Sequence, residues 1–170
     1  MENRIPLSFY TRDALEVAPD LLGKTLCRRT GEGTVQRYTI SETEAYCGEE
    51  DRACHASRGM TPRTSVMYEK GGMLYMYLIY GMYWMMNIVT GSREEPQAVL
   101  IRGLLDVSGP GRLTRSLALD GSFNGEDLQS SERIWIIDEG ARVDFSTSPR
   151  VGIDYAGAHW KMKPWRYVIK

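Results

Sequence analysis

The chain has 170 residues, of which 42% are hydrophobic and 25% are charged, and its formal net charge is −1. This length and composition are typical of one globular domain with a core of its own, and they exclude an intrinsically disordered chain. The near-neutral charge excludes a uniformly basic protein. It is compatible with a local basic face, because clustering decides whether a surface binds phosphates.

Three further features favour an intracellular protein without a membrane partner. The cysteines, Cys27, Cys47 and Cys54, are an odd number in a chain long enough to fold without disulfides, which favours a reducing compartment. The first residues lack the basic and then apolar pattern of a signal peptide. The most apolar stretch, residues 73–86, is shorter than the ~20 residues that a transmembrane helix needs.

The predicted elements are short and are often joined by tight turns. Residues 13–22 predict a helix that Asp13 caps and Gly23 ends. The further elements are strands at 24–29 and 34–46, a short helix at 48–56, strands at 74–80, 83–89 and 98–105, a helix at 112–119, and strands at 133–138, 143–145 and 165–169. Because strands outnumber helices, residues 1–170 predict a single α+β domain, in which short helices surround an antiparallel sheet.

Two carboxylates share one face of the predicted strand at 34–46. Alternation along a strand places Ile40, Glu42, Glu44 and Tyr46 on the same side. Two interpretations fit this pattern. Charged side chains on a strand usually form a solvated face. Alternatively, burial and a like-charged neighbour would raise a carboxyl pKa, which suits a general base near neutral pH.

A tyrosine-rich hairpin follows, with Gly81 and Met82 predicted as the two central residues of a type II′ turn. Tyr75 and Tyr77 lie on one face, and Tyr80 lies on the other, directly before the turn. A tyrosine at a hairpin tip suits a wedge or a stacking platform for nucleic-acid bases. The alternative is a core hairpin whose aromatic residues fill space between layers.

The segment around His55 gives no metal-binding pattern. Cys47, Cys54 and His55 lack the paired Cys-x2-Cys units typical of zinc sites. We therefore expect no metal ion, and we interpret the cysteines as small apolar residues. On spacing alone, His55 is predicted to be a structural histidine and not a catalytic one.

Basic residues gather in three places and suit either a nucleic-acid face or ordinary surface charge. They are Arg52, Arg58, Arg63 and Lys70; Arg112 and Arg115, after Gly109-Pro110-Gly111; and the Lys and Arg residues within 159–170, a segment with no acid.

Seven segments in chain order carry a more specific pattern: Glu42–Tyr46, Glu50–His55, Thr61–Arg63, Leu74–Asn87, Gly109–Leu113, Arg150–Ile153 and Lys163–Arg166. Two of them, E-T-E-A-Y and Y-x-Y-x-x-Y-G-M-Y-x-x-x-N, are distinctive. Together the segments resemble the alkyladenine (3-methyladenine) DNA glycosylase family. The resemblance implies a monofunctional base-excision enzyme whose partner is double-stranded DNA containing damaged purines. Such an enzyme flips out a lesion of the 3-methyladenine, hypoxanthine or ethenoadenine class and hydrolyses its N-glycosidic bond.

By position in these motifs, Glu44 is expected to be the general base that activates water, with Arg102 as its partner in holding that water and the backbone carbonyl near Val151 as a third contact. A carboxylate there would also stabilise the positive charge that develops on the sugar. No organic cofactor is expected. Because no lysine occurs between Lys24 and Lys70, a simple hydrolase is favoured over a Schiff-base lyase.

The resemblance also implies how the lesion is held. Tyr80 would occupy the gap left in the duplex, and Asn87 would reject a normal guanine by a clash with its 2-amino group. The remaining expected contacts are Tyr46, His55 and Tyr77 as walls of the base pocket, and Met82, Tyr83, Arg63 and Arg112 on the DNA.

The expected fold has a curved sheet and a protruding hairpin, and the expected oligomeric state is a monomer.

Two other functions fit the residues. One is a non-catalytic nucleic-acid-binding module of the same fold, with Glu42 and Glu44 as a solvated face. The other is an unrelated small-molecule hydrolase that uses the paired carboxylates.

Overall fold

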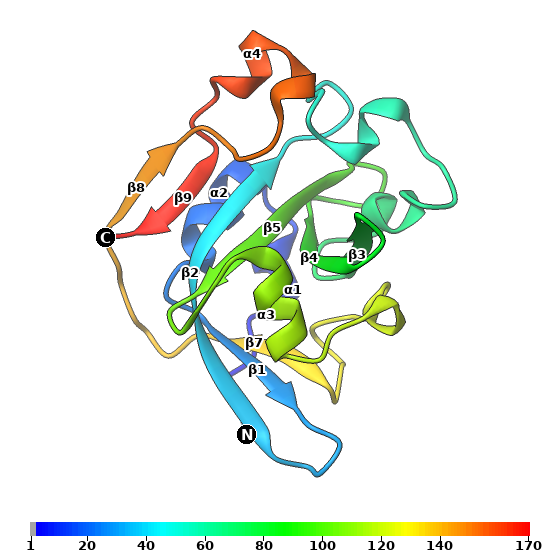
Figure 1. Ribbon diagram of the computed structural model, residues 1–170. Coiled ribbons are helices and arrows are strands. Elements are labelled where there is room, and N and C mark those ends of the chain that lie inside the picture. The colour runs from blue at the N-terminus through cyan, green and yellow to red at the C-terminus, as the bar shows by residue number, and fades with distance from the viewer. Residues whose placement is uncertain (1–2) are drawn as a thin grey trace.

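One long strand, β2 (Val35–Tyr46), organises the sheet of the computed structural model, which describes residues 3–170 (Figure 1). Its first half pairs with β1 (Thr25–Arg29). Its second half pairs with β5 (Gln97–Leu104) on one side and with β9 (Arg166–Ile169) on the other. The carboxyl end of β2 is therefore held between two strands, which fixes the side chains that it carries.

The other strands complete a mostly antiparallel sheet with the order β3-β4-β5-β2-β1-β7. They are β3 (Leu74–Ile79), β4 (Tyr83–Thr90), β6 (Val107–Ser108), β7 (Ile134–Ile137) and β8 (Phe145–Ser148). The hairpin of β3 and β4 forms one edge, and β8 extends the sheet beyond β9. Among the described residues the sheet is not closed into a barrel. The α+β prediction is confirmed.

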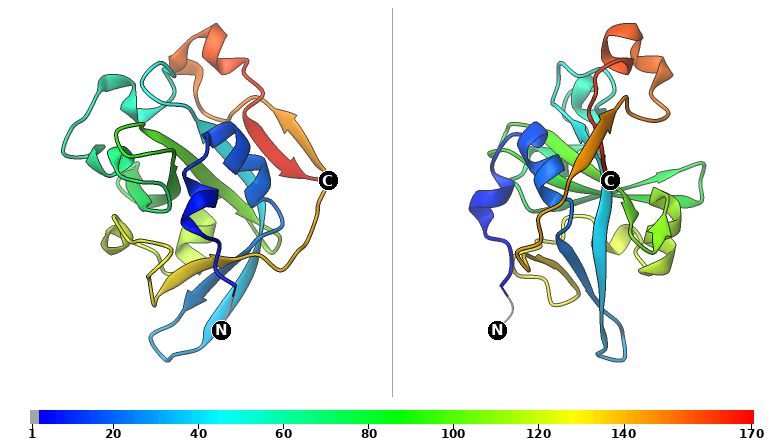
Figure 2. Two further views of the ribbon diagram at one scale, coloured as in Figure 1. Left: turned by 180° about the vertical axis from the view of Figure 1, so that it is seen from behind. Right: turned by 90° about the vertical axis from the view of Figure 1, so that its left-hand side faces the viewer.

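Short helices cover both faces of the sheet. They are α1 (Leu7–Tyr10), α2 (Ala14–Leu21), α3 (Pro110–Ser116) and α4 (Ala158–Lys161), with the 3₁₀ turns η1 (His55–Arg58), η2 (Ser65–Tyr68), η3 (Gly121–Phe123) and η4 (Asp154–Ala156). α1 and α2 lie on one face and α3 lies on the other (Figure 2). As predicted, Asp13 caps α2, because its carboxylate accepts a hydrogen bond from the Leu15 N–H at 2.8 Å.

A single large apolar cluster joins these layers. It includes fully buried side chains from α1, α2, β4, β5 and α3, namely Tyr10, Leu21, Met86, Ile101 and Leu113. Burial of apolar surface on both faces of the sheet is the main source of stability for such a domain. No helix within residues 3–170 is long and apolar enough to span a membrane.

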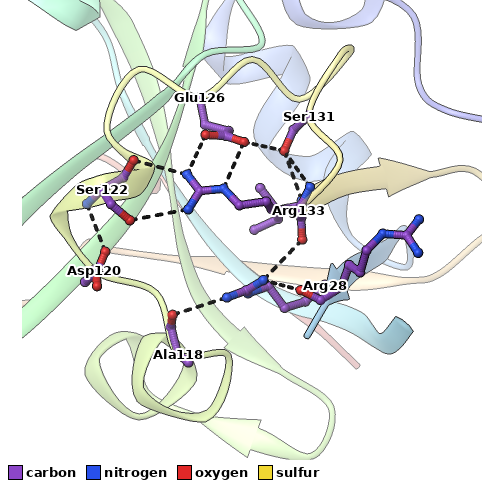
Figure 3. Close-up of polar contacts among 9 residues, drawn as sticks. Arg28, Ala118, Asp120, Ser122, Glu126, Ser131 and Arg133 are labelled. Carbon is purple, nitrogen blue, oxygen red and sulfur yellow. Dashed lines mark hydrogen bonds and ion pairs between the residues drawn. The ribbon is translucent and has the colours of Figure 1, made fainter. Parts of the chain in front are cut away.

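A polar network joins the segment after α3 to β1 and to the residue that precedes β7 (Figure 3). The Arg133 guanidinium forms an ion pair with Glu126 at 2.7 Å and lies 3.9 Å from the centroid of the Phe123 ring. Arg28 also lies over that ring, at 4.7 Å, and its Nε donates to the Leu117 carbonyl. The network fixes the segment that packs beside β3, the outer strand of the hairpin.

The short helix predicted at 48–56 is wrong. Residues 48–54 form turns, and only the 3₁₀ turn from His55 is helical. The Asp51 carboxylate accepts hydrogen bonds from the Cys47 and Ala53 N–H groups, both at 3.0 Å. These side-chain bonds give the backbone an alternative to a helix. The strand predicted at 143–145 lies instead at Phe145–Ser148, where pairing with β9 defines it.

The predicted hairpin turn is also wrong by one residue. Its central residues are Tyr80 and Gly81, with φ of 52° and 65°, and the Met82 N–H donates to the Ile79 carbonyl at 3.1 Å. Positive φ at both central residues is the geometry of a type I′ turn, which follows the right-handed twist of the strands. Tyr80 therefore occupies a conformation that non-glycine residues rarely adopt.

A β-bulge in β2 corrects the predicted face of Ile40. The register with β5 shifts between Ile40 and Glu42, where Ser41 is the extra residue, and shifts back between Glu42 and Thr43, where Arg102 of β5 is the extra residue. Ile40 lies in the main core with Ala45, whereas Glu42 stays on the face of Glu44. An extra residue interrupts the alternation of the strand that carries it.

Candidate active site

Five strands present one row of side chains across the sheet. In register, Tyr75 of β3 lies opposite Asn87 of β4, Asn87 opposite Leu100 of β5, Leu100 opposite Glu44 of β2, and Glu44 opposite Arg166 of β9. Directly paired residues share a face. A second set, two positions along the same strands, adds Tyr77, Arg102, Glu42 and Tyr46 to this face. Residues far apart in sequence thereby converge.

A cavity of about 960 Å³ opens over this face, between the loop after β2 and residues 151–155. Its walls include most of the predicted site residues: Tyr46, His55, Arg63, Tyr77, Tyr80 and Arg102. A smaller inner cavity of about 30 Å³ adjoins it and is lined by Asn87 and Tyr75. Tyr46, His55 and Tyr77 line both cavities, so the two spaces share aromatic walls.

The Glu44 side chain is fully buried and both of its oxygens are hydrogen-bonded. The Tyr46 hydroxyl donates to Oε1 at 2.8 Å, and the Val151 N–H donates to Oε2 at 2.7 Å. Burial raises the pKa of the Glu44 carboxyl, and the Arg102 charge and these two donors oppose part of the increase. The alternative of a solvated acidic face is therefore wrong for Glu44.

Glu44 lies one layer behind the cavity wall. Its contacts Tyr46, Arg102 and Val151 line the cavity, whereas its own carboxylate has no exposed surface. Arg102 Nη1 lies 3.7 Å from Glu44 Oε1, which is longer than a hydrogen bond. Here the Glu44 carboxylate comes close to a positively charged side chain of the cavity wall.

Arg102 is shared between the two glutamates of β2. Its Nε donates to Glu42 Oε2 at 3.0 Å, while Nη1 faces Glu44. Arg166 of β9 donates through its own Nε to the same Glu42 oxygen at 2.7 Å. The pair of carboxylates is thus interleaved with two guanidinium groups. This arrangement offsets the like-charge repulsion that the carboxylates would otherwise have.

A buried ion pair supports the wall that contacts Glu44. Arg150 donates to both carboxylate oxygens of Asp51, at 2.6 and 3.0 Å, and to the Ala45 carbonyl at 3.0 Å. Its guanidinium also lies 4.9 Å from the centroids of both the Tyr46 and the Trp165 rings. Arg150 directly precedes Val151, so this pair fixes the N–H group that binds Glu44.

The aromatic walls are joined to one another. The His55 and Tyr77 rings lie 4.3 Å apart between centroids, with an interplanar angle of 57°. His55 Nδ1 and the Tyr75 hydroxyl are hydrogen-bonded at 2.9 Å. Burial, with smaller contributions from Arg63 and Arg58, lowers the pKa of His55 to about 4. His55 is therefore a neutral ring at neutral pH.

Asn87 lies at the inner end of this arrangement. Its side chain is buried, its Nδ2 donates to the Tyr75 carbonyl at 3.2 Å, and it lines the small inner cavity. The hydrogen bond to the neighbouring strand holds the amide in one orientation. A group that enters the inner cavity meets this fixed amide.

The hairpin tip projects from the molecule beside the cavity mouth. The Tyr80 side chain is 86% exposed and Met82 is 61% exposed, and Tyr80 also lines the cavity. The alternative of a core hairpin is therefore wrong for its tip, although Tyr75 is buried as that alternative expects. Tyr83 is less exposed, at 37%, because its ring packs closely on Gly111 of α3. Arg112, one residue further, is exposed.

Two groups at the site were not predicted from the sequence. The Tyr155 ring lines both cavities, and its hydroxyl donates to the Ala53 carbonyl at 3.1 Å. The Asp51 carboxylate is the other. At Val151 the expected contact was the backbone carbonyl, whereas the group that binds Glu44 is the Val151 N–H. Val151 and Asp51 lie within segments of the family pattern, but only contacts between distant parts of the chain reveal what they bind.

Comparison with known proteins identifies the family of this chain. The model of the family described as Methylpurine-DNA glycosylase (MPG) matches residues 8–108 and 105–170. A protein of Psychrobacter cryohalolentis is 42% identical over 95% of this chain and 89% of its own length. One of Methanocella arvoryzae is 42% identical over 98% and 92%, and one of Sodalis glossinidius is 45% identical over 86% and 87%. All three carry the name "Putative 3-methyladenine DNA glycosylase".

The antiparallel fold, the aromatic cavity and these relatives together define a DNA glycosylase, an enzyme of base-excision repair. More narrowly, the chain belongs to the methylpurine-DNA glycosylase family.

Proposed function

We propose that this enzyme excises alkylated or deaminated purines, of the 3-methyladenine, hypoxanthine and ethenoadenine class, from double-stranded DNA by hydrolysis. The observation that carries the proposal is the buried Glu44 carboxylate behind an aromatic cavity, next to an exposed tyrosine on a hairpin tip. A base must leave the duplex before its glycosidic bond can be reached. The site offers both a space for that base and a side chain to replace it.

Glu44 is the general base and Arg102 is its partner. The Glu44 carboxylate has no exposed surface in this structure, so the attacking water binds once Arg102 Nη1 moves away from its 3.7 Å approach to Glu44 Oε1. The water is then hydrogen-bonded to both groups. As the N-glycosidic bond breaks, its electron pair leaves with the purine nitrogen, the water oxygen bonds to C1′ of the sugar, and a proton of the water passes to Glu44. The raised pKa of Glu44 favours this proton transfer, and the carboxylate also stabilises the developing sugar cation.

Tyr80 enters the duplex at the position that the flipped nucleotide leaves. Its ring is exposed before DNA binds, and burying it between base pairs recovers the apolar surface that water otherwise covers. Met82 and Tyr83 border the same tip and contact the adjacent groove. The exposed guanidinium groups of Arg63 and Arg112 bind backbone phosphates.

The cavity selects damaged purines by stacking and by exclusion. The flipped base lies between Tyr46 and the joined His55–Tyr77 wall, and an alkylated, cationic purine gains cation–π attraction from these rings. The neutral state of His55 avoids repulsion of that cation. Asn87 occupies the place of a guanine 2-amino group, which rejects a normal guanine by clash.

All these groups come from one chain, so the enzyme acts as a monomer on DNA inside the cell. The test is single-turnover release of hypoxanthine or 3-methyladenine from a duplex, read as strand cleavage after hot alkali. We expect Glu44→Gln to lose cleavage by about 10²–10⁴-fold, the range for removal of a general base, and to keep duplex binding. Equal cleavage by this variant would remove Glu44 from the mechanism.

A further inference from the structure

Glu42 makes two strong contacts although it has no place in the chemistry described so far. Its Oε2 accepts hydrogen bonds from Arg102 Nε at 3.0 Å and from Arg166 Nε at 2.7 Å. All three side chains are largely shielded, with Glu42 only 16% exposed. Charge-assisted hydrogen bonds of this length are stronger than neutral ones, and partial burial protects them from screening.

The contact with Glu42 determines which edge of the Arg102 guanidinium faces Glu44. Because Nε is bound to Glu42, the terminal nitrogen Nη1 is the one that lies 3.7 Å from Glu44 Oε1, and Arg102 also lines the cavity. A guanidinium is a planar fork, so fixing one nitrogen fixes the directions of the others. A free arginine side chain would lose this orientation through its many rotamers.

The backbone is built to bring Glu42 to this position. Glu42 pairs with Gly103 between two register shifts, one at Ser41 of β2 and one at Arg102 of β5. A Cβ added at Gly103 would lie 3.2 Å from Ser41 Oγ and 3.3 Å from Glu42 Cβ, which is tight packing. Bulges re-aim side chains next to active sites. Here the bulge moves Ile40 into the core and keeps Glu42 beside Arg102.

We propose that Glu42 is a positioning residue that acts through Arg102, with Arg166 as the second cation that balances the cluster. The inference rests on the proposed function, in which Arg102 and Glu44 hold the attacking water. Glu42 itself touches neither water nor substrate. Its role is to hold Arg102 Nη1 at the cavity wall, next to the general base.

The test compares Glu42→Ala with Glu42→Gln in single-turnover cleavage of a hypoxanthine-containing duplex. We expect the alanine variant to cleave about 10–100-fold more slowly, the size of loss seen when a hydrogen-bond partner that orients a metal ligand is removed, without a change in duplex affinity. Glutamine keeps an acceptor oxygen for Arg102 Nε, so it should recover most of the rate. If alanine does not fold, Glu42→Leu fills the space without an acceptor and takes its place.

A double-variant measurement separates positioning from a merely structural role. If Glu42 acts through Arg102, then Arg102→Ala and the double variant Glu42→Ala/Arg102→Ala should cleave at the same rate. The proposal would be overturned if Glu42→Ala slowed cleavage by the same factor in the Arg102→Ala background as in the wild type. So would a glutamine variant as slow as alanine, or an alanine variant as fast as wild type.

A matched control removes an ion pair elsewhere. Glu126→Ala breaks the 2.7 Å pair with Arg133 (Figure 3), neither of which lines the two cavities, and it should lower stability without slowing cleavage. The outcomes also distinguish the two proposals. A wild-type chain that releases no base, or a Glu44→Gln variant that cleaves normally, removes the proposed function. An active wild type with an unaffected Glu42→Ala variant removes only the role of Glu42.

Discussion

Arg150 and Asp51 are 99 residues apart in sequence, yet their fully buried side chains form two hydrogen bonds of 2.6 and 3.0 Å. The pair ties the turn region after β2 to the segment that delivers the Val151 N–H to Glu44. The two segments of the cavity wall next to Asp51 and Arg150 are therefore held together by one buried ion pair.

Removing one member of this pair should be far more damaging than removing both. Asp51→Ala leaves the Arg150 charge buried without its partner, which typically costs 3–5 kcal/mol in the free energy of unfolding. The double variant Asp51→Ala/Arg150→Met should recover much of that loss. Urea unfolding checks both, and a double variant as unstable as the single one would contradict this account.

Tyr80 should show opposite effects on stability and on DNA binding. Its φ of 52° is unfavourable for a side chain and natural for glycine, so Tyr80→Gly should raise the free energy of unfolding by up to about 1 kcal/mol. Tyr80→Ala retains the strain and should stay within about 0.5 kcal/mol of wild type. Both should weaken capture of a lesion-containing duplex, measured by fluorescence anisotropy. A large loss of stability in Tyr80→Ala would mean that the ring supports the fold.

The ionised Glu44 carboxylate should lower the free energy of unfolding at neutral pH. A carboxyl with its pKa raised by burial favours the protonated folded state, so its stabilising contribution is lost as pH rises through the folded pKa. Glu44→Gln escapes this loss, because the Tyr46 hydroxyl can reverse and accept from the amide. We expect the variant to be the more stable one at pH 7.5, with the difference shrinking towards pH 4.5 in urea titrations. A difference that grows on acidification would contradict the raised pKa.

The same shift predicts the acid side of the rate profile. The general base must be deprotonated, so single-turnover cleavage should fall below the Glu44 pKa, at a pH higher than an ordinary glutamate would give. The measurement is the cleavage rate between pH 4 and 8, after correction for the fraction folded.

His55 should titrate with a pKa of about 4, observed as ring proton shifts by NMR. Because the folded pKa lies below the unfolded value, the neutral ring contributes stability above pH 6.5, and this contribution is lost as pH falls from there towards 4. His55→Gln should lack that part of the acid sensitivity. A His55 titration near 6.5 in the folded protein would refute the buried, neutral ring.

Much of the local structure was predictable because short-range patterns encode it. The Asp13 cap, the pairing of β1 with β2, the two strands of the hairpin and the shared face of Glu42 and Glu44 follow from capping and alternation. The Tyr80 tip was predictable as a location, but its turn was displaced by one residue, since strand twist favours a type I′ geometry. The Ser41–Glu42 bulge left no signal in the alternation itself.

By itself, the sequence determined the antiparallel α+β class, the family and the shared face of Glu42 and Glu44 on β2. Only the tertiary structure decided that Glu44 is buried and that the Val151 N–H, 107 residues away, binds it. It also decided that Arg102 is shared between two glutamates and that Tyr155 joins the cavity wall. The reason is physical: alternation fixes which side of a strand a group occupies, whereas desolvation and long-range partners depend on which distant segments pack over it.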